Sequence, residues 1–191
     1  MNLRERTAEV MRAEIANAAF EVMLDHGYDA LTVEELAKAV GISRATFFRY
    51  FGSKDEVITA AMLEPADVFE QALAATPPAP GETKWQRLRV ALEPSVPRTE
   101  KQAQRRREQI RLVQAQPLLG ARLRRGRFPQ IERLAEALVG EGLTPMEAST
   151  LATAAIAVLD HSLSQWARQE RASFRRILDD AFRCLAAASE T

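Results

Sequence analysis

The sequence predicts an all-α protein, in which a small three-helix helix-turn-helix domain precedes a larger helical domain. Apolar residues recur at three- and four-residue spacing along nearly all of the 191 residues, and no run of alternating β-branched residues indicates a strand. Three capping-box patterns, at Thr32, Ser53 and Thr144, mark helix starts. The length suits one small domain, predicted at residues 1–54, joined to a larger one at residues 55–191.

The first domain is predicted to hold three helices. The first runs from about Arg4 to His26, and the second starts at Val33, directly after the Thr-x-x-Glu pattern at Thr32. Gly41 ends the second helix, because the bend into the next one needs a left-handed residue and glycine adopts that conformation without a Cβ clash. Ser43 then caps the third helix.

The third helix combines aromatic and basic residues, and residues 43–54 contain no acid. Phe47 and Phe51 are predicted to point toward the core. The outward or flanking positions carry Arg44, Thr46, Phe48, Arg49 and Tyr50. A helix of this kind can offer its N-terminal half to a major groove of DNA.

The second domain is predicted to consist of helices separated by turns that contain proline or glycine. A connecting helix starts after Ser53, is kinked at Pro65 and continues toward Leu73. Pro94 and Pro97 are expected to interrupt the helical structure between two helices. The other expected elements are a loop at residues 76–81, helices at 83–92, 99–115, 129–139, 145–168 and 172–187, and a short segment at 118–125.

Charge is balanced over the whole chain, with 26 basic and 26 acidic residues, which does not suit a protein that coats polyanions. Residues 98–127 nevertheless hold ten Lys or Arg against two acids. This basic stretch is either a solvated face or a site for an anionic ligand.

The sequence lacks the residues that several classes of protein need. The single cysteine, Cys184, excludes an internal disulfide and a thiolate zinc site. Without a Gly-rich phosphate loop, a nucleophile elbow or a metal-spaced cluster, the chain is expected to be neither an enzyme nor the holder of a metal or cofactor. No stretch approaches the roughly 20 apolar residues of a membrane span, and residues 1–12 are charged rather than signal-like. We therefore expect a soluble cytoplasmic protein with no membrane partner.

The run G-I-S-R-A-T-F-F-R-Y-F-G-S-K at residues 41–54, preceded by a long amphipathic helix, closely resembles the DNA-binding domain of the tetracycline-repressor (TetR) family of bacterial transcription regulators. The resemblance spans roughly residues 8–60. Most members carry Leu-Tyr or Ile-Tyr where this chain has Phe47 and Phe48. Because Phe48 lacks a hydroxyl, any contact that it makes with DNA must be apolar.

The resemblance implies a double-stranded, pseudo-palindromic DNA operator, with two recognition helices in successive major grooves. Arg44 is expected at a guanine edge, because its fork can bond O6 and N7 in one plane. The other expected contacts are Thr46 and Phe48 for a thymine methyl or the backbone, Thr32, Tyr50 and Lys54 for phosphates, and Arg49 for a phosphate or solvent.

A second copy of the chain is the other expected macromolecular partner, since one short recognition helix discriminates poorly against a genome of competing sites. The predicted helices at 145–168 and 172–187 are long and rich in small and apolar residues. In the family that the chain resembles, the corresponding pair packs against its symmetry mate as a four-helix bundle. The alternative is that both helices belong to an intrachain core.

The resemblance further implies a cavity among the middle helices, whose small-molecule ligand alters the spacing of the two recognition helices. The C-terminal half looks like mycofactocin-regulator-like members of the family that sense long-chain acyl-coenzyme A thioesters, and arginines at the cavity mouth would suit the phosphates of such a ligand. Each candidate for the lining is also an ordinary core residue. The candidates are Trp85, Leu88, Val113, Leu119, Leu123, Phe128, His161 and Trp166.

The predicted function is a ligand-responsive transcriptional regulator. The resemblance implies a repressor, since repression is the commoner mode of the family and a dimer over a promoter blocks polymerase, but no residue of the sequence decides between repression and activation. The effector could be an acyl thioester, a drug or another small molecule. The alternative is an architectural or protein-interaction module without a small-molecule inducer.

Overall fold

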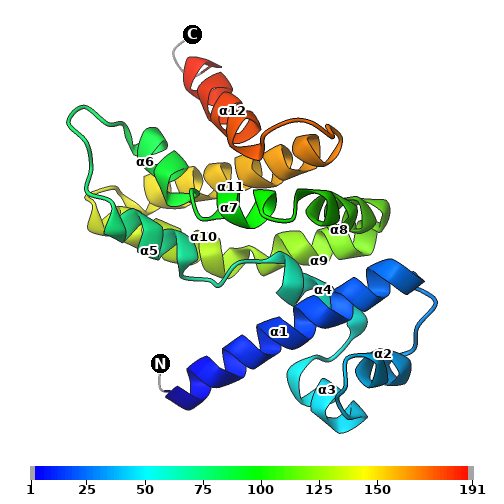
Figure 1. Cartoon of the computed structure of the whole chain (residues 1–191). Coiled ribbons are helices and arrows are strands. Elements are labelled where there is room, and N and C mark those ends of the chain that lie inside the picture. The colour runs from blue at the N-terminus through cyan, green and yellow to red at the C-terminus, as the bar shows by residue number, and fades with distance from the viewer. Residues whose placement is uncertain (1–2, 189–191) are drawn as a thin grey trace. The chain divides into compact units, whose positions relative to one another are not determined.

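The regular elements are helices throughout the part that the computed structural model describes, residues 3–188 (Figure 1). The prediction of an all-α fold is confirmed. The helices gather into two compact units. The first holds the described residues up to Leu63 together with Ala115–Gly126, and the second holds Glu64–Gln114 together with the described residues from Arg127 onward. The domain boundary expected between residues 54 and 55 stays a prediction.

The first unit is built around α1, which packs against α2 and α4, while α2 packs against α3 and α4 packs against α9. Its helices are α1 (Leu3–His26), α2 (Val33–Ala39), α3 (Arg44–Tyr50), α4 (Lys54–Met62) and α9 (Pro117–Gly126). The core includes the buried side chains of Phe20, Met23, Leu36, Phe47 and Phe51. The three helices predicted for the N-terminal region are confirmed.

Side-chain caps explain where α2 and α4 begin. The Thr32 hydroxyl accepts from the Glu35 amide and the Glu35 carboxylate accepts from the Thr32 amide, which confirms the predicted capping box. The predicted box at Ser53 is wrong in one half. Ser53 accepts from the Glu56 amide, but the Glu56 carboxylate accepts from the amide of the residue before Ser53, at 2.8 Å. That carboxylate also binds Arg12 of α1 at 3.2 Å, so a tertiary contact competes with the local one.

The turn between α2 and α3 depends on Gly41, whose φ is +74°. No atom lies within 4 Å of a Cβ built there, so the need for glycine is conformational rather than steric. We expect Gly41→Ala to lower the free energy of unfolding by about 1–2 kcal/mol. Gly140 is the matched control, because a Cβ there also meets open space but the residue is helical, and Gly140→Ala should not destabilise. Urea unfolding compares the two variants, and equal losses would contradict the conformational explanation.

The second unit is built around α11, which packs against α6, α10 and α12. Its helices are α5 (Val68–Ala75), α6 (Lys84–Ala91), α7 (Ser95–Glu100), α8 (Ala103–Ala115, with its last residue in the first unit), α10 (Phe128–Gly140), α11 (Pro145–Ala167) and α12 (Phe174–Ala188). The capping box predicted at Thr144 is confirmed. None of the described helices combines the length and the apolar character that crossing a membrane requires.

Two predictions about prolines are wrong. Pro65 does not kink one connecting helix, because α4 and α5 are separate helices with residues 63–67 between them. Pro97 does not interrupt the helical structure, because it is the third residue of α7. At that position a backbone N–H would have no acceptor within the helix, so proline loses no hydrogen bond there. The basic helix therefore begins at Ala103 rather than at Thr99.

Candidate nucleic-acid interface and ligand region

The recognition helix α3 has one side that is buried through aromatic residues and an outer face that is exposed. Ser43 caps the helix by accepting from the Thr46 amide at 3.0 Å. Phe47 and Phe51 are buried, with their ring centroids 5.6 Å apart. This packing leaves Phe48 on the outside, where it is 44% exposed. The outer face of α3 therefore combines an exposed aromatic ring with the basic residues of the helix.

Arg44 lies on this outer face, with 65% of its side chain exposed. Its guanidinium lies over the Phe48 ring, 4.9 Å from the ring centroid, and its Nε donates to the carboxylate of Glu34 on α2. A hydrogen bond from its own backbone amide, and then one from Arg44, hold the pKa of the Glu34 carboxyl below its usual range. The sequence contains no signal that indicates Glu34, because a pair ten residues apart across a turn produces no periodic pattern.

The other predicted contacts on α2 and α3 have partners within the protein. Thr32 Oγ1 donates to the capping carboxylate of α2 at 2.8 Å, and Thr46 Oγ1 accepts from the Ser43 hydroxyl at 3.0 Å. The Arg49 guanidinium lies 5.0 Å from the centroid of the Tyr50 ring. Thr32 and Arg49 are exposed, whereas Thr46 and Tyr50 are half-buried. Their contacts with DNA stay predictions.

Lys54 is used within the protein to a degree that its sequence position did not suggest. Its Nζ donates to the backbone oxygens of Tyr28 and Leu31, at 2.6 and 2.8 Å, and lies 4.5 Å from the centroid of the Tyr28 ring. Two of the three ammonium donors of Lys54 thus stabilise the turn between α1 and α2. In the same turn, burial and then a hydrogen bond to Asp55 raise the pKa of Tyr28 to about 12. Its predicted phosphate contact stays a prediction.

The residues predicted to line a ligand cavity lie in different surroundings. Trp166 is buried beneath Arg107, whose guanidinium carbon is 3.9 Å from the ring centroid, and meets Phe174 edge to face. Trp85 stacks on Phe182 with centroids 4.5 Å apart. Of the others, Leu88 and Val113 are buried, Phe128 and His161 are exposed, and Leu119 (buried) and Leu123 (half-buried) lie on α9 of the first unit. Their role in ligand binding stays a prediction.

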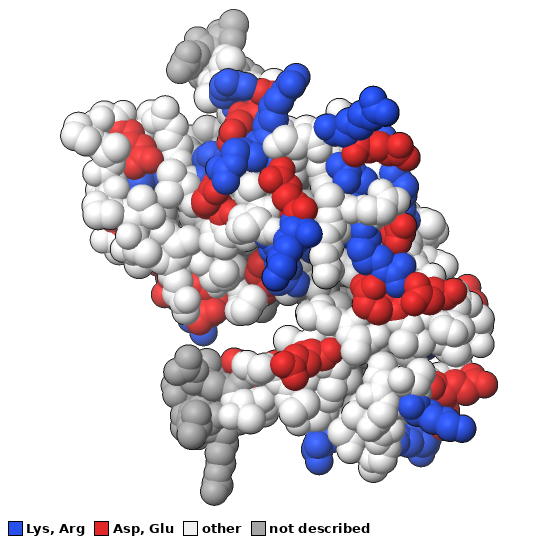
Figure 2. All heavy atoms as spheres, viewed as in Figure 1, with Lys and Arg blue, Asp and Glu red and all other residues white. Residues whose placement is uncertain are grey.

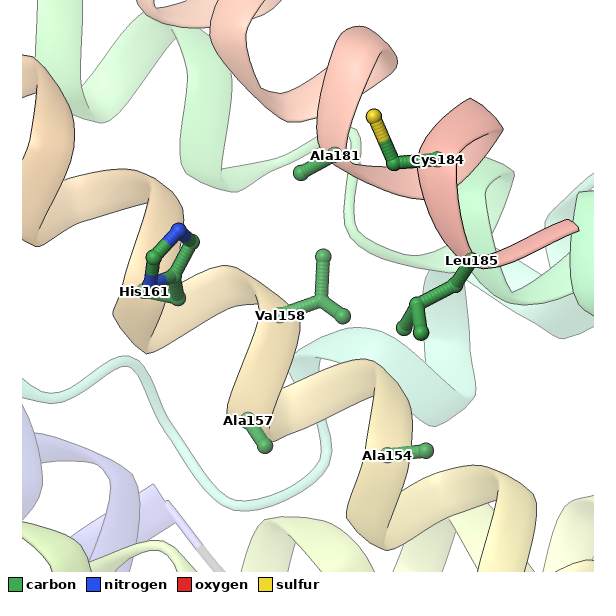
Figure 3. Close-up of a pocket in the computed structure, with 7 residues that line it drawn as sticks. All are labelled: Ala154, Ala157, Val158, His161, Ala181, Cys184 and Leu185. Atoms are coloured by element: carbon green, nitrogen blue, oxygen red, sulfur yellow. The ribbon is translucent and has the colours of Figure 1, made fainter. Parts of the chain in front are cut away.

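A hollow of about 520 Å³ lies between α11 and α12 (Figure 3). From α11 it is lined by Ala154, Ala157, Val158 and His161, at the i, i+3, i+4, i+7 spacing of one helix face. From α12 it is lined by Ala181, Cys184 and Leu185. Figure 3 shows Val158 and Leu185 pointing into the space between the two helices. We call these seven residues the α11–α12 face, and its lining is apolar apart from one imidazole and one thiol.

The basic stretch at residues 98–127 is not a uniformly solvated face. Arg106, Arg107 and Arg127 are buried, so that interpretation is wrong for these three. Arg111 donates to a backbone carbonyl at the C-terminal end of α11, at 2.9 Å, where a cation is favoured by the helix dipole. Figure 2 shows acidic and basic side chains interleaved on the visible face. Much of this positive charge is therefore used inside the protein.

Arg127 is the centre of a buried polar network in the second unit. The residue is 2% exposed, and its guanidinium donates to Glu64 at 3.1 Å, to Asp160 at 2.8 Å and to Gln130 at 3.0 Å. Gln130 also donates to the Glu64 backbone oxygen at 2.8 Å. Burial raises the pKa of Glu64, but the charges of nearby arginines, Arg127 foremost, outweigh it and hold the pKa below its usual range.

Comparison with known proteins identifies relatives of the N-terminal part. Residues 15–61 match the model of the tetR family of bacterial regulatory proteins. The HTH-type transcriptional regulator TcmR of Streptomyces glaucescens is 38% identical over 73 residues, which are 38% of this chain and 30% of TcmR. The putative mycofactocin biosynthesis transcriptional regulator MftR of Mycobacterium tuberculosis is 40% identical over 43 residues, 22% of either chain. The chain thus matches less than a third of the length of these two relatives.

The fold has relatives over nearly its whole length. The crystal structure of the transcriptional regulator FadR from Bacillus subtilis, in complex with stearoyl-CoA, aligns with a TM-score of 0.60. The alignment covers 92% of this chain and 97% of FadR at 16% sequence identity. At that identity the likeness establishes a shared fold.

Proposed function

This chain belongs to the TetR family of bacterial regulatory proteins, and from that premise we propose that it is a ligand-responsive transcriptional repressor, which binds a pseudo-palindromic DNA operator as a homodimer. The outer face of α3 carries this proposal. There Arg44 and Phe48 are exposed on a helix whose opposite face is anchored in the core by Phe47. A rigid helix with an exposed arginine fork is suited to reading base edges in a major groove.

The proposed contacts divide into base readout and positioning. Arg44 reads a guanine, and Phe48 and Thr46 meet a thymine methyl or the backbone. The proposed phosphate contacts are Thr32, Arg49, Tyr50 and Lys54. Of these, Lys54 has one ammonium donor left after its two bonds to backbone oxygens.

The α11–α12 face supports the proposed homodimer. An apolar helix pair with a hollow between its helices offers a second copy of the same pair a surface to pack against, in the self-complementary way that a two-fold axis requires. Two recognition helices joined in this way would engage two half-sites about 34–36 Å apart, as expected for consecutive turns of B-DNA.

The proposed effector is a small apolar or amphipathic molecule, and a long-chain acyl-coenzyme A is the specific candidate. The stearoyl-CoA bound to FadR supports this class of ligand, because FadR shares the fold. Since Arg106, Arg107 and Arg127 are buried, the exposed arginines of the basic stretch, such as Arg124 and Arg125, are better candidates for contacts with its phosphates.

A mobility-shift experiment on the DNA that flanks the gene of this protein tests the proposal. We expect a shifted band that is released by one ligand class from a panel of long-chain acyl-coenzyme A species and apolar drugs. A shift that nothing in the panel releases would remove the proposed effector and keep the DNA-binding proposal. Binding without sequence preference, or no binding, would favour an architectural or protein-interaction module instead.

Substitution of two basic residues separates base readout from phosphate contact. We expect Arg44→Ala to relax sequence preference by removing about 1–3 kcal/mol of discrimination at one base pair. Lys54→Ala should weaken binding to all sequences about equally and lower the salt slope by about one. Fluorescence anisotropy with cognate and base-substituted duplexes at several salt concentrations measures both. Circular dichroism must accompany it, because Lys54 also stabilises the turn between α1 and α2. Indistinguishable behaviour of the two variants would refute the division of roles.

A further inference from the structure

The exposed guanidinium of Arg44 is held on two sides in the free protein. Its Nε donates to Glu34, and its plane lies over the Phe48 ring, with 4.9 Å between the guanidinium carbon and the ring centroid. Both members of the ion pair are more than half exposed. Water competes strongly for such a pair, so its contribution to the stability of the fold is small. The contact is therefore better explained by a role in positioning Arg44 than by a role in stabilising the fold.

The contact with Glu34 leaves the two Nη groups of Arg44 available for contact with DNA. The contact with Glu34 uses Nε, and among the described residues no group accepts a hydrogen bond from the two Nη groups. These two groups form a planar fork, which matches the O6 and N7 acceptors of a guanine in the major groove. An arginine that is already oriented loses less rotamer freedom when the fork engages a base.

The charge of Glu34 acts in the opposite direction on the DNA backbone. Its carboxyl is ionised at neutral pH, as an ordinary carboxyl is, and its own backbone amide and Arg44 lower its pKa further. A phosphate that approaches Arg44 would also approach this carboxylate, and like charges repel. Glu34 therefore opposes contact between Arg44 and the phosphates of any sequence, without opposing contact with a neutral base.

We propose that Glu34 is a specificity-determining residue, which positions Arg44 for a guanine and disfavours its use on phosphates. This inference rests on the proposed function. Glu34 itself need not touch the base that is read, because it acts through the guanidinium of Arg44. Phe48 supplies the second support, because its exposed ring lies beneath the guanidinium.

The test compares Glu34→Gln with the wild-type protein on two DNA probes. The first probe is a duplex selected by the wild-type protein from a randomised library, and the second is a duplex of random sequence and equal length. We expect Glu34→Gln to lower affinity for the selected duplex and to raise affinity for the random one. The ratio of the two affinities should fall by about threefold to tenfold, the scale of one exposed pair combined with one removed charge.

Two control variants separate this role from simpler ones. Glu136→Gln removes the same charge from an exposed position on α10 of the second unit and should leave the ratio unchanged. In the Arg44→Ala background, Glu34→Gln should cause no further fall in the ratio, because the residue through which it acts is gone. Circular dichroism of all variants checks that α2 and α3 remain folded.

Each result has a distinct meaning. A fall in the ratio for Glu34→Gln alone, absent in the Arg44→Ala background, supports the inference. An unchanged ratio, an equal change on both probes, or a fall that persists without Arg44 would overturn it while leaving the proposed regulator intact. If the wild-type protein enriches no sequence from the library, the proposed function fails, and the inference fails with it.

Discussion

An Ala157→Glu variant is expected to be monomeric at concentrations at which the wild-type protein forms the proposed dimer. Ala157 is exposed in the middle of the α11–α12 face, between Ala154 and His161. In the proposed dimer, a glutamate there would place two like charges in an apolar contact, where neither has a partner. Sedimentation velocity measures the change in mass. Affinity for a two-half-site operator should fall by about a hundredfold or more, because the second half-site no longer binds with the first.

Ala74→Glu is the matched control for this variant. Ala74 is an exposed alanine on α5 of the same unit, outside the α11–α12 face, so the same substitution there should leave the dimer intact. Binding to a single half-site should be similar for the two variants and the wild type. A dimeric Ala157→Glu protein would remove this face from the interface, and dissociation of both variants would point to a general effect of charge.

Arg127→Met is expected to lower the free energy of unfolding by about 3–5 kcal/mol, the cost of breaking a buried ion pair on one side. Methionine fills much of the same volume but leaves the buried Glu64 carboxylate without its ion pair with Arg127, the strongest of the arginine charges that act on it. Urea unfolding followed by circular dichroism measures the loss. Adding Glu64→Gln to Arg127→Met should recover part of it, because a neutral amide is less costly to bury than a carboxylate. A loss below about 1 kcal/mol, or no recovery, would contradict this account of the network.

The pH dependence of stability should also change in this variant. In the wild type the folded-state pKa of Glu64 is depressed, so its contribution to stability is present above the ordinary carboxyl range and is lost as pH falls through the folded pKa. Without Arg127, burial is opposed only by the charges of Arg98 and Arg106, so the pKa of Glu64 should rise. The loss of stability relative to the wild type should therefore be larger at pH 7.5 than at pH 5. Urea midpoints at pH 5 and pH 7.5 distinguish the two cases, and the same slope in both proteins would be the contrary result.

Local signals in the sequence predicted the helix-turn-helix well. The capping box at Thr32, the serine cap at Ser43 and the positive φ of Gly41 involve groups within a few residues of one another, so they can be recognised without a tertiary structure. The buried positions of Phe47 and Phe51 follow from helical spacing in the same way. The fold class rests on this kind of regularity.

Predictions failed where a distant group competes with a local one. Glu56 matches the pattern of a capping box at Ser53, yet its carboxylate binds Arg12 of α1 and the amide before the cap. A composition-based interpretation of the basic stretch could not separate buried Arg127 from exposed Arg124, because both are arginines in the same segment. Burial is decided by what packs on a side chain, and that information is spread over the chain.

The all-α fold, the helix-turn-helix and the candidate residues on α3 could be predicted from short segments of the sequence, because helix periodicity, caps and turns are encoded within short windows. The tertiary structure decided how those residues are used: it paired Arg44 with Glu34 and engaged Lys54 with two backbone oxygens. It also buried Arg127 against Glu64 and Asp160, and it left the α11–α12 face open. These pairings join residues that are ten or more positions apart, and only the packing of one helix on another brings such residues into contact.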